Sequence, residues 1–145
     1  MVFSEAEQAY LNSQPLGRLA TLRKDGTPQV NPVGFRLNPD TGTIDIGGFT
    51  MSTSQKFRNI AADGRVSFVV DDIASRDPWR VRCVEIRGSA EAVPGPKAAE
   101  GNPDGAIIRI TPERVLSFGV DQTNQAPHEM TTNNRDVGKG AASNR

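Results

Sequence analysis

Apolar and polar residues alternate in a series of short stretches along most of this chain. Alternation with a period of two residues is typical of strands that bury one face. Turn residues separate the stretches, and the Asp25-Gly26 pair between the first two is typical of a β-hairpin. Strands are therefore predicted over residues 17–22, 28–35, 43–48, 65–70, 81–93, 106–110 and 114–120. Six or seven short strands at hairpin spacing favour an antiparallel barrel or sandwich over a parallel α/β fold.

Two segments have the spacing of short helices instead. Ser4 followed by Glu7 forms a capping-box pattern, which predicts a helix from about Glu5 to Ser13. A second helix is predicted over residues 52–62, where three apolar residues lie at i, i+3 and i+4. The fold class expected from the residues is therefore mainly β with two short helices.

The remaining segments are polar. Residues 71–80 are predicted to form a polar loop, with Asp71 and Asp72 at a solvated strand end, and residues 94–104 a linker rich in Gly and Pro. Pro32 has no N–H group, so its strand is expected at a sheet edge, at a bulge or beside a ligand. Residues 1–120 are predicted to form one domain, followed by a polar tail at 121–145 that cannot order itself alone.

Composition narrows the classes of function. The 145 residues carry 17 basic and 17 acidic side chains, so no net charge favours binding to nucleic acid or to an anionic membrane. We found no run of 18 apolar residues and no secretion signal, so the protein is expected to be cytoplasmic. The single Cys83 excludes a disulfide framework and a cysteine-based zinc site, and is interpreted as a packed residue. His128 has no partner at metal-ligand spacing, so no metal site is expected.

The most informative stretch runs from Gly47 to Asn59. A glycine pair leads into Thr50, Ser52 and Ser54, and Lys56 follows within the first turn of the predicted helix. A helix start exposes unpaired N–H groups, and hydroxyls with a lysine there favour an anion such as phosphate. The alternative is an ordinary capped helix start with a solvated lysine.

Several of these segments, taken in order, resemble those of a known family. Residues 16–22, 25–35, 55–60 and 64–72 are similar to the split β-barrel flavin and deazaflavin proteins, the pyridoxamine 5'-phosphate oxidase-like (PPOX) superfamily. Residues 77–88 resemble actinobacterial members that are thought to use coenzyme F420. The resemblance covers about residues 1–120 and implies an FMN-binding type of split β-barrel.

The same resemblance implies a homodimer with two cofactor sites at the subunit interface. It implies that the cofactor phosphate lies at the predicted helix start and that the ring lies along residues 29–34. Many relatives carry a basic residue where this chain has Gln55, which leaves F420 and FMN both open as cofactors. Trp79 is interpreted either as an apolar plug or as a lid over a flat cofactor. The expected cofactor-binding residues are Gln29, Asn31, Pro32, Val33, Thr50, Ser52, Ser54, Gln55, Lys56 and Trp79.

The sequence offers few acid–base candidates, so the catalytic residues stay unknown and the chemistry is expected to belong to a cofactor. The leading hypothesis is an F420(H2)-dependent oxidoreductase that transfers hydride to or from a small unsaturated or conjugated substrate. The alternatives are an FMN-binding flavoprotein of the same fold and a non-enzymatic carrier of a cofactor or tetrapyrrole-like ligand. Arg135, in the tail, is a candidate contact with the partner's site. Arg80, Arg82 and Arg87 either bind an acidic cofactor tail or, the favoured interpretation, pair with nearby glutamates.

Overall fold

The computed structural model of the chain describes residues 1–95, 104–121 and 126–138. The described elements follow the order α1 (Glu5–Ser13), β1 (Leu16–Leu22), β2 (Pro28–Gly34), β3 (Arg36–Asn38), β4 (Thr43–Gly47), η1 (Met51–Thr53), α2 (Gln55–Ala62), β5 (Arg65–Arg76), β6 (Trp79–Val93), β7 (Ile107–Phe118), η2 (Pro127–Glu129) and β8 (Asn133–Asp136). No helix in the described ranges is long and apolar enough to cross a membrane.

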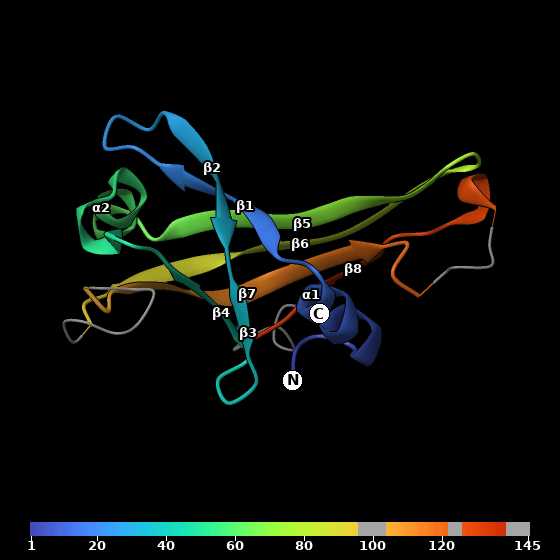
Figure 1. The fold of residues 1–145 in the computed structure, drawn as a ribbon, viewed down its shortest axis with the longest axis horizontal. Helices are drawn as coiled ribbons and strands as arrows, with labels where there is room; N and C mark the ends of the chain where they lie inside the picture. Colours follow the sequence, from blue (N-terminus) through green and yellow to red (C-terminus); the bar gives the residue numbers. More distant parts are fainter. Residues whose placement is uncertain (96–103, 122–125, 139–145) are drawn as a thin grey trace.

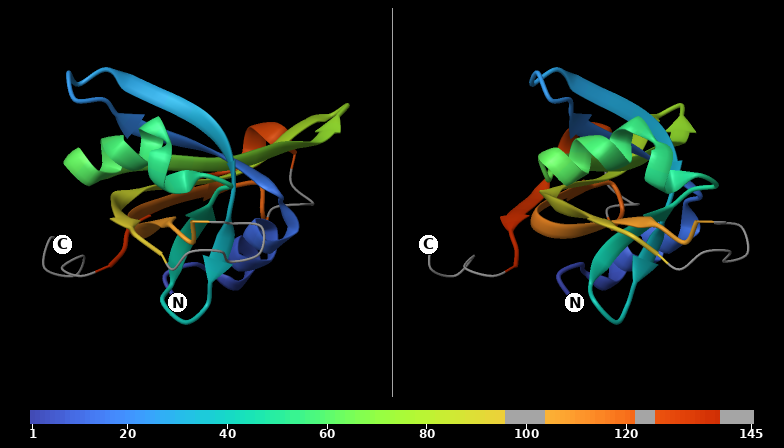
Figure 2. Two further views of the ribbon diagram at one scale, coloured as in Figure 1. Left: turned by 60° about the vertical axis from the view of Figure 1, so that its left-hand side comes forward. Right: turned by 90° about the vertical axis from the view of Figure 1, so that its left-hand side faces the viewer.

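All the strands belong to one curled antiparallel sheet in the order β2-β1-β5-β6-β7-β4-β3, and β8 pairs with β7. The long strands β5, β6 and β7 curve across the molecule, and β3 and β4 cross them steeply (Figure 1). Helix α2 lies at one end of these strands and the turn that joins β5 and β6 at the other, as Figures 1 and 2 show. The prediction of a mainly β split barrel with two helices is confirmed.

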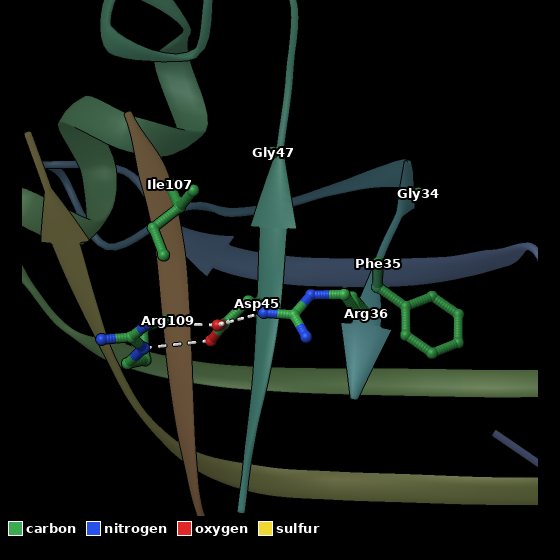
Figure 3. Close-up of a pocket in the computed structure, with 7 residues that line it drawn as sticks. All are labelled: Gly34, Phe35, Arg36, Asp45, Gly47, Ile107 and Arg109. Atoms are coloured by element: carbon green, nitrogen blue, oxygen red, sulfur yellow. Dashed lines mark hydrogen bonds and ion pairs between the residues drawn. The ribbon is translucent and has the colours of Figure 1, made fainter. Parts of the chain in front are cut away.

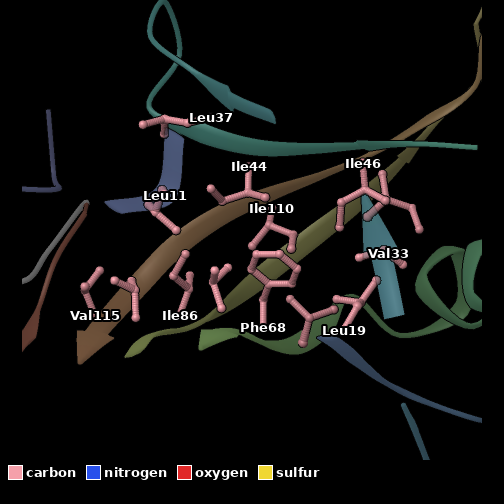
Figure 4. Packing of buried hydrophobic residues seen from close by; sticks show 14 of the residues in the cluster. Leu11, Leu19, Val33, Leu37, Ile44, Ile46, Phe68, Ile86, Ile110 and Val115 are labelled. Atoms are coloured by element: carbon pink, nitrogen blue, oxygen red, sulfur yellow. The ribbon is translucent and has the colours of Figure 1, made fainter. Parts of the chain in front are cut away.

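The interior of the sheet is filled by one cluster of buried apolar side chains from both helices and most strands (Figure 4). Phe68 on β5 is fully buried and meets Phe35 edge to face, with the ring centroids 5.2 Å apart. A Cβ at Gly17 would lie 2.3 Å from the Phe68 ring, so β1 reaches this ring only because residue 17 is glycine. The alternating pattern of the sequence thus corresponds to one continuous core.

The prediction of a loop over residues 71–80 is wrong. β5 continues to Arg76 and β6 begins at Trp79, so this segment is the end of a long hairpin. Its carboxylates are paired rather than solvated: Asp71 lies 3.0 Å from Arg18, and Asp72 accepts hydrogen bonds from Arg82 and from the Tyr10 hydroxyl. Pairing across strands allows polar residues to continue a sheet that the pattern of polarity predicts to end.

The two strands predicted over 106–110 and 114–120 are a single strand, β7. The register between β6 and β7 shifts at Gly88, which faces Pro112. This irregularity accommodates Pro112, which has no N–H to donate to the ladder. A Cβ at Gly88 would lie 2.1 Å from the Thr111 carbonyl oxygen, so only glycine fits there.

The second helix begins later than predicted. Residues 51–53 form the separate 3₁₀ turn η1, and α2 starts at Gln55 with Ser54 as its N-cap. The Ser54 hydroxyl accepts a hydrogen bond from the Phe57 N–H, and extended backbone at Ser54 breaks the helix there. The first helix, its capping box and the edge position of the Pro32 strand are confirmed: β2 pairs only with β1 in the described part of the chain.

The polar segment after residue 121 contributes a strand that the sequence analysis did not predict. β8 pairs with β7 opposite residues 114–117. Arg135 on β8 reaches the carboxylate of Glu7 on α1, with atoms 2.6 Å and 2.9 Å apart, and Ser117 donates to the same carboxylate. Most of the predicted linker at 94–104, and residues 122–125 and 139–145 of the tail, lie outside the described residues.

Candidate functional site

A cavity of about 280 Å³ lies between the end of β2 and the segment that follows β4. Three consecutive residues of β2 form one wall, and the glycine pair at the end of β4 forms another. The start of α2 closes one side. Its lining residues are Pro32, Val33, Gly34, Gly47, Gly48, Phe49, Thr50, Met51, Ser54 and Lys56.

One end of this cavity carries groups that could hold an anion. The Lys56 side chain is half-buried at the cavity, with no ion pair to any residue in the described ranges. The backbone N–H groups of Gln55 and Lys56 open α2 and donate to no residue in the described ranges. An ammonium beside two free N–H groups at the positive end of a helix favours a phosphate or carboxylate.

Ser52 lies apart from this cavity. Its N–H and its hydroxyl both donate to a carboxylate oxygen of Asp104, at 2.9 Å and 2.7 Å. These bonds hold the pKa of Asp104 below its usual range. The hydroxyl that the sequence analysis assigned to a ligand phosphate is therefore already bonded to a carboxylate of the same chain.

Gln55 is also engaged within the protein. Its amide donates to Asn59 at 2.7 Å and accepts from Arg58 at 2.9 Å, while Asn59 donates to Thr21 on β1. This network runs from the exposed Arg58 to the buried bond between Asn59 and Thr21, which joins α2 to the sheet. A glutamine can both donate and accept here, and a cation in its place could only donate.

The side chains of Gln29 and Asn31 bond to each other at 2.9 Å, and Gln29 also accepts from Arg23. Neither lines the cavity, whereas the next residues of β2, Pro32 and Val33, do. Of the ten expected cofactor residues, the structure thus gathers Pro32, Val33, Thr50, Ser54 and Lys56 around one cavity.

Trp79 is not brought to this cavity within one chain. It begins β6, next to the turn with β5, at the opposite end of the molecule from α2 (Figure 1). Its side chain is 54% exposed. Neither a plug nor a lid is therefore formed by Trp79 inside a single subunit.

A second cavity of about 440 Å³ adjoins the first, because both are lined by Gly34 and Gly47 (Figure 3). This second cavity was not predicted from the sequence. The sequence contained one signal for this cavity: Asp45 and Arg109 are charged residues that each stand between two isoleucines in a strand. The lining residues are Gly34, Phe35, Arg36, Asp45, Gly47, Ile107 and Arg109.

Asp45 is the buried charge at this second cavity. Its carboxylate accepts from Arg109 at 3.0 Å and 3.1 Å, from Asn38 at 2.9 Å and from Thr43 at 2.8 Å. Burial alone would raise the pKa of Asp45, but these hydrogen bonds outweigh it and the pKa lies below its ordinary value. Asp45 is therefore a permanent carboxylate, unsuited to donate a proton near neutral pH.

The other candidate groups have structural partners. Burial raises the pKa of the Cys83 thiol, with Glu85 and Asp71 adding to the effect, which makes it a poor nucleophile. Arg87 pairs with Glu85, as the favoured interpretation of pairing with glutamates predicts. Arg82 pairs with an aspartate instead, Asp72. The described residues contain no cluster of side chains that would bind a metal. The site offers binding groups and no acid–base pair.

Comparisons with known proteins agree with this description. Residues 3–119 match the family model of pyridoxamine 5'-phosphate oxidase. The chain is 43% identical over 122 residues to a 5a,11a-dehydrotetracycline/5a,11a-dehydrooxytetracycline reductase of Streptomyces rimosus, which covers 83% of this chain and 86% of the reductase. A solved F420 reductase has a TM-score of 0.59 and 31% identity, covering 76% of this chain and 95% of that one. A conserved hypothetical protein from Mycobacterium tuberculosis has a TM-score of 0.68 and 27% identity, covering 86% and 90%.

Proposed function

Because the chain belongs to the pyridoxamine 5'-phosphate oxidase family, we propose that it is an oxidoreductase that binds deazaflavin F420 and reduces a small conjugated substrate. The 43% identical relative is a reductase, and a solved F420 reductase shares the fold at 31% identity. Both relatives support reduction as the reaction, and the second supports F420 over FMN.

The observation that carries the proposal is the anion site at the start of α2. Lys56 supplies a cation at one end of the cavity, and the first turn of α2, which begins at Gln55 beside it, has N–H groups with no acceptor inside the helix. F420 and FMN both carry a phosphate on a ribityl chain that extends from a flat ring system. The residues present therefore fit the phosphate end of either cofactor.

The walls of the cavity suit the ring. Gly47 and Gly48 leave space beside the end of β2, and Phe49 presents an aromatic face that is 72% exposed. The outer edge of β2 offers main-chain groups, because no other described strand pairs with it. An apolar wall with a few main-chain groups orients a flat ring and excludes water from one face.

A reduced deazaflavin bound here would supply a hydride for reduction of the acceptor, with the proton coming from solvent. Lys56 would hold its phosphate, and residues 32–34 would lie along its ring. No protein proton donor is assigned, in keeping with the absence of an acid–base pair among the described residues of the site.

Titration of the purified protein with F420 and with FMN tests the proposal. We expect saturable quenching of F420 fluorescence and weaker binding of FMN. Tighter binding of FMN would replace F420 by FMN in the proposal. Failure to bind either cofactor would contradict a flavin or deazaflavin enzyme, and F420 binding without reduction of any conjugated acceptor would favour a carrier.

A further inference from the structure

Charged side chains of alternating sign form a row across neighbouring strands at the second cavity. Arg36 on β3 is paired in register with Asp45 on β4, and Asp45 is paired in register with Arg109 on β7. The row continues to Glu91 on β6, which faces Arg109. Figure 3 shows Arg36 and Arg109 on opposite sides of the Asp45 carboxylate.

The two arginines relate to Asp45 in different ways. Arg109 forms two hydrogen bonds to the carboxylate, and Asn38 and Thr43 provide two more. Four donors fill the lone-pair positions of a carboxylate. The nearest nitrogen of Arg36 is 3.8 Å away, which is too far for a hydrogen bond.

The Asp45 carboxylate therefore has its full set of hydrogen bonds without Arg36. The Arg36 side chain is 67% exposed at the cavity and has no hydrogen bond within the described part of the chain. Glu91, outside the cavity lining, faces Arg109 from the neighbouring strand, whereas Arg36 has only the distant ion pair to Asp45. Ile107 and the two shared glycines make the rest of the lining largely uncharged.

We propose that Arg36 forms a subsite for the anionic oxygen of the substrate, a carboxylate or the enolate of an acidic carbonyl compound. The proposal rests on the proposed function, which puts the cofactor ring in the adjoining cavity. An acceptor in the second cavity would meet the ring at Gly34 and Gly47, the residues common to both. Its oxygen would then lie within reach of the guanidinium group.

This placement also suits the proposed reduction. When hydride adds to the β-carbon, the carbon–carbon π bond breaks and its electron pair becomes negative charge on the carbonyl oxygen. A guanidinium group beside that oxygen stabilises the charge as it develops. Arg36 would thus contribute both to the choice of acidic substrates and to the rate of reduction.

Two small probes distinguish this role from general surface charge. Cyclohexane-1,3-dione is an enolate at neutral pH, and 2-cyclohexen-1-one is neutral and of similar size. Their affinities for the protein are measured by NMR titration in wild type, Arg36→Gln and the control Arg65→Gln. Arg65 is an exposed arginine with a single ion pair, to Asp63, and lies outside both cavities.

We expect Arg36→Gln to weaken binding of the dione about tenfold, as for the loss of one charge-assisted hydrogen bond, and to leave 2-cyclohexen-1-one within about threefold. Arg65→Gln should change neither. Equal losses for both probes, or no loss, would overturn the subsite.

F420 affinity in the same variants separates substrate from cofactor. The proposal requires Arg36→Gln to bind F420 as wild type does, whereas weaker F420 binding would assign Arg36 to the acidic part of the cofactor and overturn the substrate role. If wild type fails to bind F420 while Arg36-dependent binding of the dione persists, the proposed function fails and the anion subsite stands.

Discussion

At the scale of single residues, two buried carboxylates organise this protein. Glu7 is fully buried at the start of α1 and Asp45 is 7% exposed at the second cavity. Each one is surrounded by donors, and each has an arginine from a strand distant in sequence: Arg135 for Glu7 and Arg109 for Asp45. Buried charges are stable only when paired in this way.

Glu7→Gln tests the first of these pairs. The variant keeps the size of the side chain and leaves Arg135 without its carboxylate. We expect a loss of about 2–3 kcal/mol in the free energy of unfolding, somewhat less than for a fully buried pair, because Arg135 is partly exposed. Urea denaturation measures it. Glu5→Gln is the control, since Glu5 is exposed in the same turn of α1, and an equal loss in both variants would contradict the account.

The same carboxylates predict how stability depends on pH. Burial raises the pKa of Glu7, but hydrogen bonds from Arg135, Ser117 and Ser4 outweigh it, so the pKa is lowered in the folded state, as it is for Asp45. A carboxylate whose pKa is lowered by folding stabilises the folded state at pH values above its pKa in the unfolded chain, about 4. This stabilisation is lost as the pH falls through the pKa of the folded state. Unfolding free energy should therefore fall below about pH 5 and fall less steeply in Glu7→Gln; equal slopes would contradict this.

At the scale of elements, the start of α2 determines which groups the proposed anion site contains. Ser54, and not Ser52, is the N-cap, and Ser52 instead bonds to Asp104 in front of β7. The helix therefore begins with Gln55 and Lys56, so their backbone N–H groups belong to its first turn and have no acceptor within the helix.

Two alanine variants test this start. Ser54→Ala should lower the free energy of unfolding by about 1 kcal/mol, the usual cost of a lost N-cap. Ser52→Ala removes an exposed contact and should cost about half as much or less. Thermal or urea denaturation gives both values, and a larger loss in Ser52→Ala would restore the predicted helix start at residue 52.

The elements also show how far the sequence could predict the fold. Alternation located β1, β2, β4, the first half of β5 and all but the start of β6, because each buries one face in the core. It missed the second half of β5, where Asp71 and Asp72 are satisfied by Arg18 and Arg82 from other elements. It missed β8 for the same reason, since the partner of Arg135 lies more than a hundred residues away.

At the scale of the whole molecule, several large apolar side chains remain exposed. Phe49 lies at the cavity, Val30 on the edge strand β2 and Trp79 at the tip of the β5–β6 hairpin, and they are 72%, 65% and 54% exposed. The resemblance to the split β-barrel family implies a homodimer, and these side chains are apolar surface that a second copy could cover. We propose a homodimer in which the tip of one subunit approaches the cavity of its partner.

Light scattering in solution checks the dimer. The expected mass is twice the 15.6 kDa of one chain. Trp79→Ser should shift the mass toward the monomer and weaken F420 binding. The control is Ile73→Ser, another exposed apolar residue of the same hairpin, and it should have a smaller effect on both the mass and F420 binding. A monomeric wild type that binds F420 at full affinity would contradict a site shared between subunits.

The candidate site was predictable in part. The glycine pair, the hydroxyls and Lys56 indicated an anion site because a helix start has the same donors in any fold. The hydrogen bonds from Ser52 to Asp104 and from Gln55 to Asn59 were not predictable, because folding brings these partners together. The second cavity was missed because the charges that line it come from three strands.

The most direct test of the central claim is the dissociation constant of F420 for wild type and Lys56→Ala. Loss of one charge-assisted hydrogen bond predicts about 10- to 100-fold weaker binding. Lys24→Ala, which removes the same charge from the β1–β2 turn, should stay within about twofold. Equal affinity in wild type and Lys56→Ala would contradict a cofactor phosphate at the start of α2.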